Sequence, residues 1–387
     1  MYLYGKNDLF KTLCPEGGDN IYELLNFAER YGLSGNLKKA AIAWVIMKDE
    51  NPFSLSCERS PAKGSAEWYA RADIAELCRH FFISPNQDIL ENYTPINNRI
   101  SGEEKRIGQM ITDFVAELNS TPTEVEFFDC VKNFYATWGV GDFGINKAFY
   151  MQDDGSLNPV SHIKDFTFED ICGYDIQKQK LISNTASFTS GGGANNVLLY
   201  GDSGTGKSTS IKAVLNMFYD KGLRMIQIQK HQFRHLSGLT EMLKRRNYRF
   251  VLYMDDLSFE DFEVEYKYLK AAIEGGLEEK PENVLIYATS NRRHLIKETF
   301  TEREGGDDIH RNESIQEKIS LSDRFGLSIF YPKPAQQEYF EIVEHLAQRK
   351  GISIDHDQLI AEARKWGIAH GGYSGRTATQ FIEQFLI

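Results

Sequence analysis

The residues with the clearest chemical meaning lie at positions 201–209, where Gly-Asp-Ser-Gly-Thr-Gly-Lys-Ser-Thr fits the pattern G-x-x-x-x-G-K-[ST]. Glycines at this spacing let backbone N–H groups wrap around phosphates, and the helix expected to begin here adds the positive end of its dipole. Lys207 would reach the β- and γ-phosphates, and the Ser208 hydroxyl would ligate Mg²⁺. The segment predicts a phosphate-binding loop made of Gly201, Asp202, Ser203, Gly204, Thr205, Gly206, Lys207, Ser208 and Thr209.

A second chemical signal lies 48 residues beyond Lys207, where the apolar run 250–254 ends in Asp255 and Asp256. Carboxylates at the end of a buried strand can hold a metal ion and polarise a water molecule. We assign Asp255 to Mg²⁺, directly or through water, and Asp256 to the attacking water. Together with the phosphate loop, this pair predicts a site for a nucleoside triphosphate.

The elements that must position these residues lie in the second half of the chain. Short β-rich apolar runs alternate there with helical stretches, at 196–200, 224–229, 250–254, 283–289 and 327–331. Near-continuous apolar strands between helices indicate a parallel sheet covered on both faces. Three helical segments follow Pro332 and Pro334. We therefore predict an α/β nucleotide-binding domain over 166–331 and a helical lid over 332–387.

The first half of the chain has a different pattern. From Ile21 to about Trp138 apolar residues recur at three- and four-residue spacings, which predicts an all-α N-terminal domain over 1–150. The polar, turn-rich sequence that follows predicts a linker over 151–165. Residues 1–160 hold 15 basic and 23 acidic side chains, so −8 of the total charge of −11 lies in this half. The charged stretch 297–317 is expected to be an exposed insertion.

Length, charge and cysteine usage exclude several classes. A chain of 387 residues has room for two or three domains, and its net charge of −11 gives no global basic field toward nucleic acid or anionic lipid. The longest apolar run, Ala40 to Met47, is far shorter than the ~20 residues of a membrane span. Five scattered cysteines without a C-x-x-C pair argue against a disulfide framework or zinc knuckle. We expect a soluble cytoplasmic protein without a membrane partner.

From Phe166 to the C-terminus these motifs resemble an AAA+ ATPase. More narrowly, the chain is similar to an uncharacterised prokaryotic family of AAA-type ATP-binding proteins, in the segments DDLSFE, LKAAIEGGLE, YATSNRRHLI, SLSDRFGL and SGR. The resemblance implies ATP and Mg²⁺ as cofactors, Mg²⁺-dependent ATP hydrolysis, and a homo-oligomer such as a hexameric ring. It does not supply a substrate.

The resemblance also implies roles for further residues. Asn291, after the strand 283–289, matches the sensor 1 position, whose side chain orients the lytic water or contacts the γ-phosphate. Arg324 lies in a segment similar to the one that carries the arginine finger, which reaches the ATP of a neighbouring subunit and stabilises transition-state charge. Arg376 matches sensor 2, which contacts the γ-phosphate from the lid. Ile171 and Tyr174 match in position the segment that holds the adenine.

The sequence leaves the biological role open between three alternatives. In the first, the protein remodels a protein partner captured by its acidic N-terminal domain. In the second, it is a loader or switch on nucleic acid, because replication initiators and helicase loaders resemble this chain in its Asp-Asp pair, and the basic clusters 244–246 and 292–294 offer a positive lining. In the third, it is a slow nucleotide-sensing module. An aromatic–Gly dipeptide, which is typical of unfoldase pore loops, is absent after the second core strand, where Lys230-His231-Gln232-Phe233 stands instead.

Overall fold

The computed structural model describes residues 3–4, 21–59, 64–83, 88–96, 100–259, 264–274, 281–291 and 324–384. By its internal contacts the chain divides into two compact units. The N-terminal unit is Met1–Ala148 with Pro159–Ile163, and the nucleotide-binding unit is Phe149–Asn158 with Lys164–Ile387. The basic cluster 292–294 and the expected insertion 297–317 lie outside the described residues.

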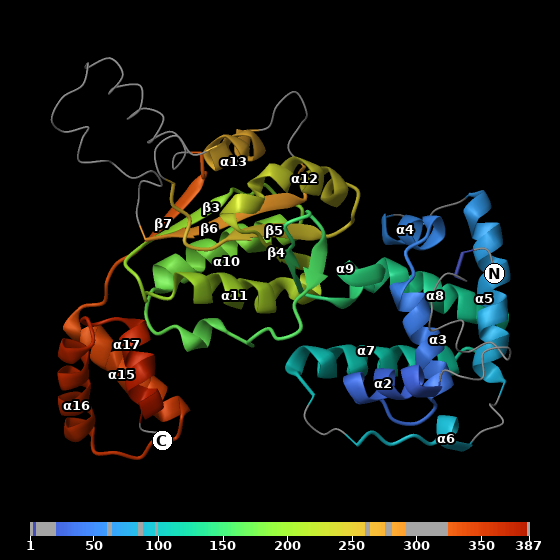
Figure 1. Ribbon diagram of the computed structural model, residues 1–387, viewed down its shortest axis with the longest axis horizontal. Coiled ribbons are helices and arrows are strands. Elements are labelled where there is room, and N and C mark those ends of the chain that lie inside the picture. The colour runs from blue at the N-terminus through green and yellow to red at the C-terminus, as the bar shows by residue number, and fades with distance from the viewer. Residues whose placement is uncertain are drawn as a thin grey trace. The chain divides into compact units, whose positions relative to one another are not determined.

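The described secondary structure of the N-terminal unit, up to strand β1, is helical (Figure 1). Its helices are α2 (Ile21–Tyr31), α3 (Leu37–Lys48), α4 (Pro52–Arg59), α5 (Ser65–Phe82), α6 (Asp88–Glu91), α7 (Gly102–Asn119), α8 (Glu124–Trp138) and α9 (Gly141–Ile145). Ser101 and Thr123 cap α7 and α8 by accepting hydrogen bonds from the N–H groups of Glu104 and Glu126. This confirms the all-helical N-terminal region expected from the sequence.

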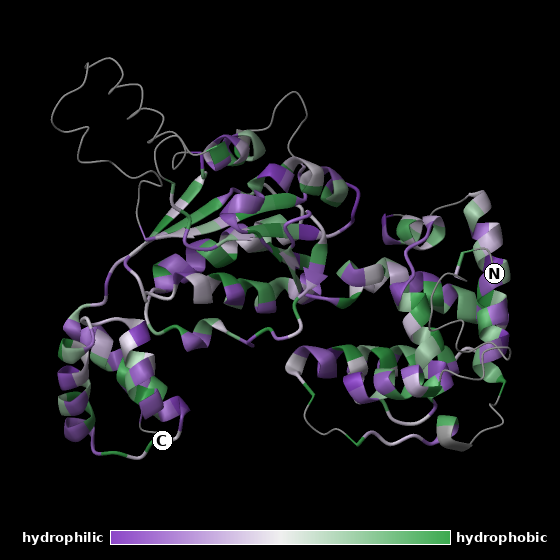
Figure 2. Ribbon diagram, viewed as in Figure 1, coloured by the Kyte–Doolittle hydropathy of each residue, from purple (hydrophilic) through white to green (hydrophobic). Residues whose placement is uncertain are grey.

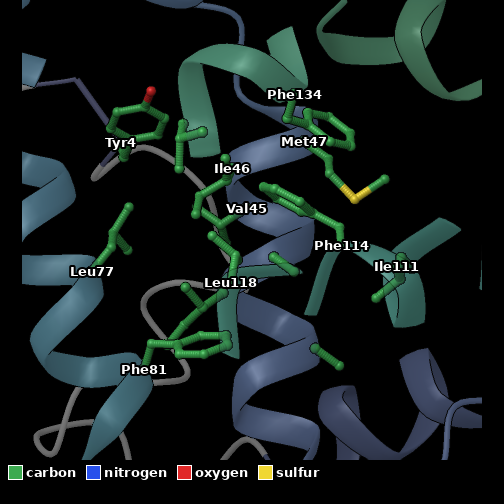
Figure 3. Close-up of a cluster of buried hydrophobic side chains, with 14 of the residues drawn as sticks. Tyr4, Val45, Ile46, Met47, Leu77, Phe81, Ile111, Phe114, Leu118 and Phe134 are labelled. Atoms are coloured by element: carbon green, nitrogen blue, oxygen red, sulfur yellow. The ribbon is translucent and has the colours of Figure 1, made fainter. Parts of the chain in front are cut away.

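Helix α3 forms the centre of this unit. Eight of its residues are buried, and they lie all around the helix rather than on one stripe. Figure 3 shows Val45, Ile46 and Met47 of α3 among side chains that include Phe114 and Phe134. The longest apolar run of the sequence is therefore the buried core helix of a bundle. Among the helices that the structure describes, none is long and apolar enough to cross a membrane.

The nucleotide-binding unit is built on a sheet in the order β2-β1-β4-β5-β6-β3-β7. From β4 to β7 neighbouring strands are parallel, with the register Val197↔Leu327 and Met254↔Ala288. The strands are β1 (Ala148–Met151), β2 (Leu157–Pro159), β3 (Val197–Gly201), β4 (Leu223–Gln227), β5 (Arg249–Met254), β6 (Val284–Ser290) and β7 (Leu327–Tyr331). This confirms the parallel α/β sheet that the sequence predicted.

Helices cover both faces of this sheet. Figure 1 shows α10 (Asp175–Thr189) and α11 (Lys207–Phe218) on one face, with α12 (Leu236–Lys244) and α13 (Val264–Glu274) on the other. The strands are accordingly apolar along most of their length, as the green of Figure 2 shows. The described connections between these helices and strands include the short 3₁₀ helices η1 (Phe168–Asp170), η2 (Tyr219–Lys221) and η3 (Lys230–His235).

The lid follows β7 and consists of α15 (Gln336–Arg349), α16 (His356–Ala369) and α17 (Gly375–Gln384). It has an apolar core of its own, which includes Tyr339, Val343, Ala363, Ala378 and Phe381. An ion pair between Arg349 of the lid and Asp170 joins the lid to the segment between β2 and β3. A helical lid was expected here, and the structure confirms it.

The segment expected to be a linker, 151–165, is partly ordered as a hairpin instead. Strands β1 and β2 join the edge of the sheet beside β4. The turn between them is closed by the Gly155 N–H, which donates to the Gln152 carbonyl, and by the Ser156 N–H, which donates to the Asp154 carboxylate. Polar residues with Gly are typical of hairpin turns as well as of linkers, and composition does not separate the two.

Candidate functional site

The phosphate loop connects β3 to α11, and its glycines have the backbone that the sequence pattern requires. Gly204 and Gly206 have φ of 78° and 90°, in the left-handed region that residues with a Cβ rarely adopt. A Cβ on Gly204 would also lie 3.0 Å from the Ser374 Oγ of the lid. Helix α11 begins at Lys207, so its free N–H groups point toward the loop. Free N–H groups at a helix start, beside a glycine loop of this kind, are suited to binding an anion.

The side chain of Lys207 folds back onto the loop that precedes it. Its side chain is buried, with 6% of the residue exposed, and its Nζ donates to the carbonyls of Gly201 at 2.8 Å and Asp202 at 2.6 Å. Burial lowers the pKa of Lys207, against the opposing pull of nearby carboxylates. The ammonium is thus held at the floor of the loop by neutral oxygens, where phosphate oxygens would be stronger partners.

Ser208 and Asp255, which the sequence analysis assigns to Mg²⁺, lie side by side. The Ser208 Oγ donates to Asp255 Oδ1 at 2.7 Å. Burial alone would raise the pKa of Asp255, but hydrogen bonds, led by the one from Thr289, outweigh it and hold that pKa below its usual range. A hydroxyl and an ionised carboxylate are hard oxygen donors of the kind that Mg²⁺ takes together with phosphate oxygens and water. The residues present therefore fit Mg²⁺.

Asp256 and Asn291 form the other half of the polar cluster. The Asn291 Nδ2 donates to Asp256 Oδ1 at 2.7 Å, and the Asn291 Oδ1 accepts from Lys207 Nζ at 3.2 Å. Asn291 thereby joins the phosphate-loop lysine to the second acid of the pair. Asp256 itself has φ of 51°, which is uncommon for a residue other than glycine.

These side chains line one cavity of about 540 Å³. The lining includes Lys207, Ser208, Asp255, Asp256 and Asn291, the loop residues from Ser203 to Thr209, and Arg376 at the start of α17. Gly201 and Asp202 stand outside the lining and contribute their carbonyls to Lys207 instead. Residues from four separate segments of the nucleotide-binding unit are thus brought to one place.

Both candidates for base contact border this cavity. Ile171 is buried, and its side chain lies 3.4 Å from the position that a Cβ on Gly206 would take. Tyr174 has φ of 58°, and its hydroxyl donates to the Pro332 carbonyl at 2.8 Å, while its ring packs on Tyr331. Tyr174 therefore also fixes the chain where it leaves the sheet for the lid.

Arg324 lies elsewhere. It precedes β7, and β7 runs parallel to β3 with Gly201 opposite Tyr331. Arg324 is accordingly at the edge where the strands begin, whereas the phosphate loop is at the edge where they end, roughly 16 Å away for five residues of strand. Arg324 does not belong to the described lining of the cavity.

Sequence reasoning missed several lining residues. Thr289 lies near the end of β6, two residues before Asn291, so its closeness in sequence to a predicted site residue is the signal that could have found it. Ile342 and Leu346 reach the cavity from α15 of the lid. Their four-residue spacing marks a helix face, but nothing in the sequence says that this face turns toward the nucleotide.

The match to a known family covers this unit except for its last residue. Residues 145–386 match the family described as "Protein of unknown function (DUF815)", which is more than half of the chain. The chain belongs to this family. The region shared with DUF815 proteins includes the β1–β2 hairpin, the sheet and most of the lid, whereas helices α2 to α8 lie outside it.

Solved structures similar to this DUF815 protein include RuvB of Thermotoga maritima, described as a Holliday junction branch migration motor. It is 15% identical with a TM-score of 0.36, over 57% of this chain and 72% of that chain. A variant of the same protein is 16% identical with a TM-score of 0.37, at the same coverage. At this level the likeness does not extend to function. A search of curated proteins gave no match.

Proposed function

We propose that this protein is a Mg²⁺-dependent ATPase. The observation that carries the proposal is the chain of contacts from Lys207 through Asn291 to Asp256, 3.2 and 2.7 Å long, beside the Ser208–Asp255 pair. A cation for phosphates, an oxygen pair for the metal and an acid for water are the parts that phosphoryl transfer to water needs. The resemblance to AAA+ proteins favours ATP as the nucleotide.

Each residue then has a defined task. Lys207 and the loop N–H groups bind the β- and γ-phosphates, while Ser208 and Asp255 hold Mg²⁺, which when bound neutralises phosphate charge. Asp256 accepts a hydrogen bond from the attacking water, and Asn291 orients that water and the acid together. Arg376 faces the charge that develops on the γ-phosphate from the lid side. Catalysis is positioning and charge stabilisation rather than covalent chemistry.

The purified protein is expected to release phosphate from ATP in the presence of Mg²⁺. Phosphate release should stop when EDTA removes the metal. Phosphate release over time, at several ATP concentrations, measures this. Manganese should substitute because it accepts the same oxygen donors. Equal turnover with and without a divalent cation would reject the assignment of Ser208 and Asp255.

Arg324 is expected to act on a neighbouring subunit, since it stands at the opposite edge of the sheet from its own phosphate loop. Arg324→Ala should lower hydrolysis by about 10³-fold or more in the homo-oligomer. Mixing it with Asp256→Asn subunits, which keep an intact arginine, should restore part of the activity. Arg364→Ala, which removes an exposed lid arginine, is the matched control. A protein that stays monomeric with ATP, and no rescue at any ratio, would count against action in trans.

We further propose that turnover is coupled to remodelling of a protein partner through the acidic N-terminal unit, in the cytoplasm. Segment η3, where unfoldases carry a mobile aromatic grip, is fixed here. Phe233 is 1% exposed, Lys230 Nζ donates to the Ser258 carbonyl at 3.2 Å, and His231 lies 2.8 Å from Asp153 of the hairpin. This favours a partner that is engaged outside η3.

A loader or switch on nucleic acid is the second candidate. The observation that favours it is the Asp255–Asp256 pair at the end of β5, which the chain shares with replication initiators and helicase loaders. The third option, slow nucleotide sensing, predicts single-turnover rates too low for mechanical work.

A further inference from the structure

One buried side chain touches both acids of the site. Thr289, near the end of β6, is 2% exposed, and its Oγ1 donates to Asp255 Oδ1 at 2.6 Å. The same Oγ1 accepts the N–H of Asp256 at 2.9 Å. Its backbone carbonyl accepts the N–H of Leu257 at 2.7 Å. A single residue of the neighbouring strand therefore holds the segment 255–257 at three points.

The backbone of Asp256 gives this contact its importance. Its φ of 51° lies in the left-handed region, and Tyr174 is the other residue with a side chain in that region within the described parts of the chain. Such a conformation persists only where surrounding contacts impose it. The Thr289 hydroxyl supplies the contact at the Asp256 N–H, and with this backbone the Asp256 carboxylate meets the Asn291 amide at 2.7 Å.

The hydroxyl acts on Asp255 as well. Ser208 and Thr289 both donate to Oδ1 of this carboxylate, from α11 and from β6. Two donors on one oxygen restrict how the carboxylate can turn. Because Thr289 also holds the next residue along the chain, the metal-binding acid and the water-binding acid share one support.

We propose that Thr289 is a positioning residue that sets the geometry of both Asp255 and Asp256, so that Mg²⁺ binding and water activation depend on one hydroxyl. This inference rests on the proposed ATPase function. It assigns Thr289 no contact with the nucleotide. Partners of metal ligands in other proteins change metal affinity or activity by roughly 10–100-fold when they are removed.

Two substitutions separate the hydroxyl from the shape of the side chain. Thr289→Val keeps the branched shape and removes the hydroxyl, whereas Thr289→Ser keeps the hydroxyl. Thr185→Val is the matched control, because Thr185 of α10 is fully buried and its hydroxyl bonds to Tyr287 on the same strand β6, away from the acids. A general effect of losing a buried threonine hydroxyl would appear in both valine variants.

The experiment measures binding of a fluorescent ATP analogue in EDTA and in a Mg²⁺ titration, together with single-turnover hydrolysis. For Thr289→Val we expect metal-free binding within about twofold of the native protein, a Mg²⁺ requirement raised about tenfold or more, and hydrolysis lowered about 10–100-fold. Thr289→Ser should recover to within a few-fold, and Thr185→Val should leave the Mg²⁺ requirement unchanged.

An unchanged Mg²⁺ requirement and rate in Thr289→Val would overturn the proposal, and so would a serine variant as impaired as the valine one. Circular dichroism and thermal melts confirm folding first. If Thr289→Val does not fold, Thr289→Ala provides a second variant without the hydroxyl, with the same expected results. A native protein that shows no Mg²⁺-dependent binding or hydrolysis would reject the ATPase function itself. If the native protein is active, and Thr289→Val has the same Mg²⁺ requirement and hydrolysis rate, only the role of Thr289 is rejected.

Discussion

Lys207→Ala is expected to weaken ATP binding strongly. The Nζ is buried beneath the phosphate loop and bonds to two loop carbonyls and to Asn291. Its loss removes the cation that faces the phosphates and also takes one hydrogen-bond donor from each of these three oxygens, of which the Asp202 carbonyl keeps the Thr205 hydroxyl as a partner. Truncating one partner of a buried charged hydrogen bond costs about 2–5 kcal/mol, so affinity should fall roughly 30- to several thousand-fold.

Isothermal titration with ATP and Mg²⁺ measures this loss. Lys221→Ala is the matched control, because Lys221 is an exposed lysine in η2, beyond the far end of α11. It should bind ATP like the native protein. Affinity of Lys207→Ala within threefold of the native value, in a protein that melts normally, would show that the loop does not bind phosphates as proposed.

Asp256→Asn is expected to bind ATP with nearly native affinity while hydrolysis falls about 10²- to 10⁴-fold, the usual contribution of a general base. The substitution preserves shape, and asparagine tolerates the left-handed backbone at this position. The amide oxygen can still accept the hydrogen bond from Asn291. Only the negative charge beside the water is lost, so turnover and binding should separate.

Single-turnover hydrolysis and equilibrium binding, measured on one preparation, test this separation. Asp220→Asn, an exposed acid in η2, serves as the control and should hydrolyse ATP normally. Native turnover in Asp256→Asn would remove this acid from the mechanism. Equal loss of binding and turnover would indicate that Asp256 has a structural role.

The same variant, held in its ATP-bound state, distinguishes the biological alternatives. A partner that stays bound to the Asp256→Asn variant with ATP, and is not retained by the double variant that also carries Lys207→Ala, binds in a nucleotide-dependent way. Loss of retention on deletion of the N-terminal unit supports remodelling of a protein. DNA binding that falls steeply with salt supports the loader, because phosphate contacts release counterions.

How much of this site the sequence predicts depends on how local each contact is. The phosphate loop and the Asp255–Asp256 pair each lie within one short segment, and their residue types and spacing carry the chemistry. The support that Thr289 gives to both acids depends on the parallel register of β5 and β6, in which Met254 lies opposite Ala288. No local pattern encodes this register, so the left-handed backbone of Asp256 could not be anticipated.

The β1–β2 hairpin could not be predicted from the sequence for a different reason. Asp153, Asp154 and Gly155 are turn residues, and a turn between two strands has the same composition as a flexible connection. Strand β1 has four residues and β2 three, too short for a convincing alternation of polar and apolar side chains. Their place in the sheet depends on contacts with η3, such as the Gln232 Nε2 that donates to the Met151 carbonyl at 2.9 Å.

The β1–β2 hairpin decides where a fragment that contains the whole nucleotide-binding unit must begin. A fragment that starts after residue 160 would lack β1, the strand beside β4, and would bare the backbone N–H and C=O groups along one edge of the sheet. Uncovered sheet edges pair with other chains and aggregate. A fragment that keeps β1 and β2, beginning near residue 145 as the family match does, retains its own protecting strands. The natural border of the nucleotide-binding unit therefore lies upstream of the polar turn that separates the two halves in the sequence.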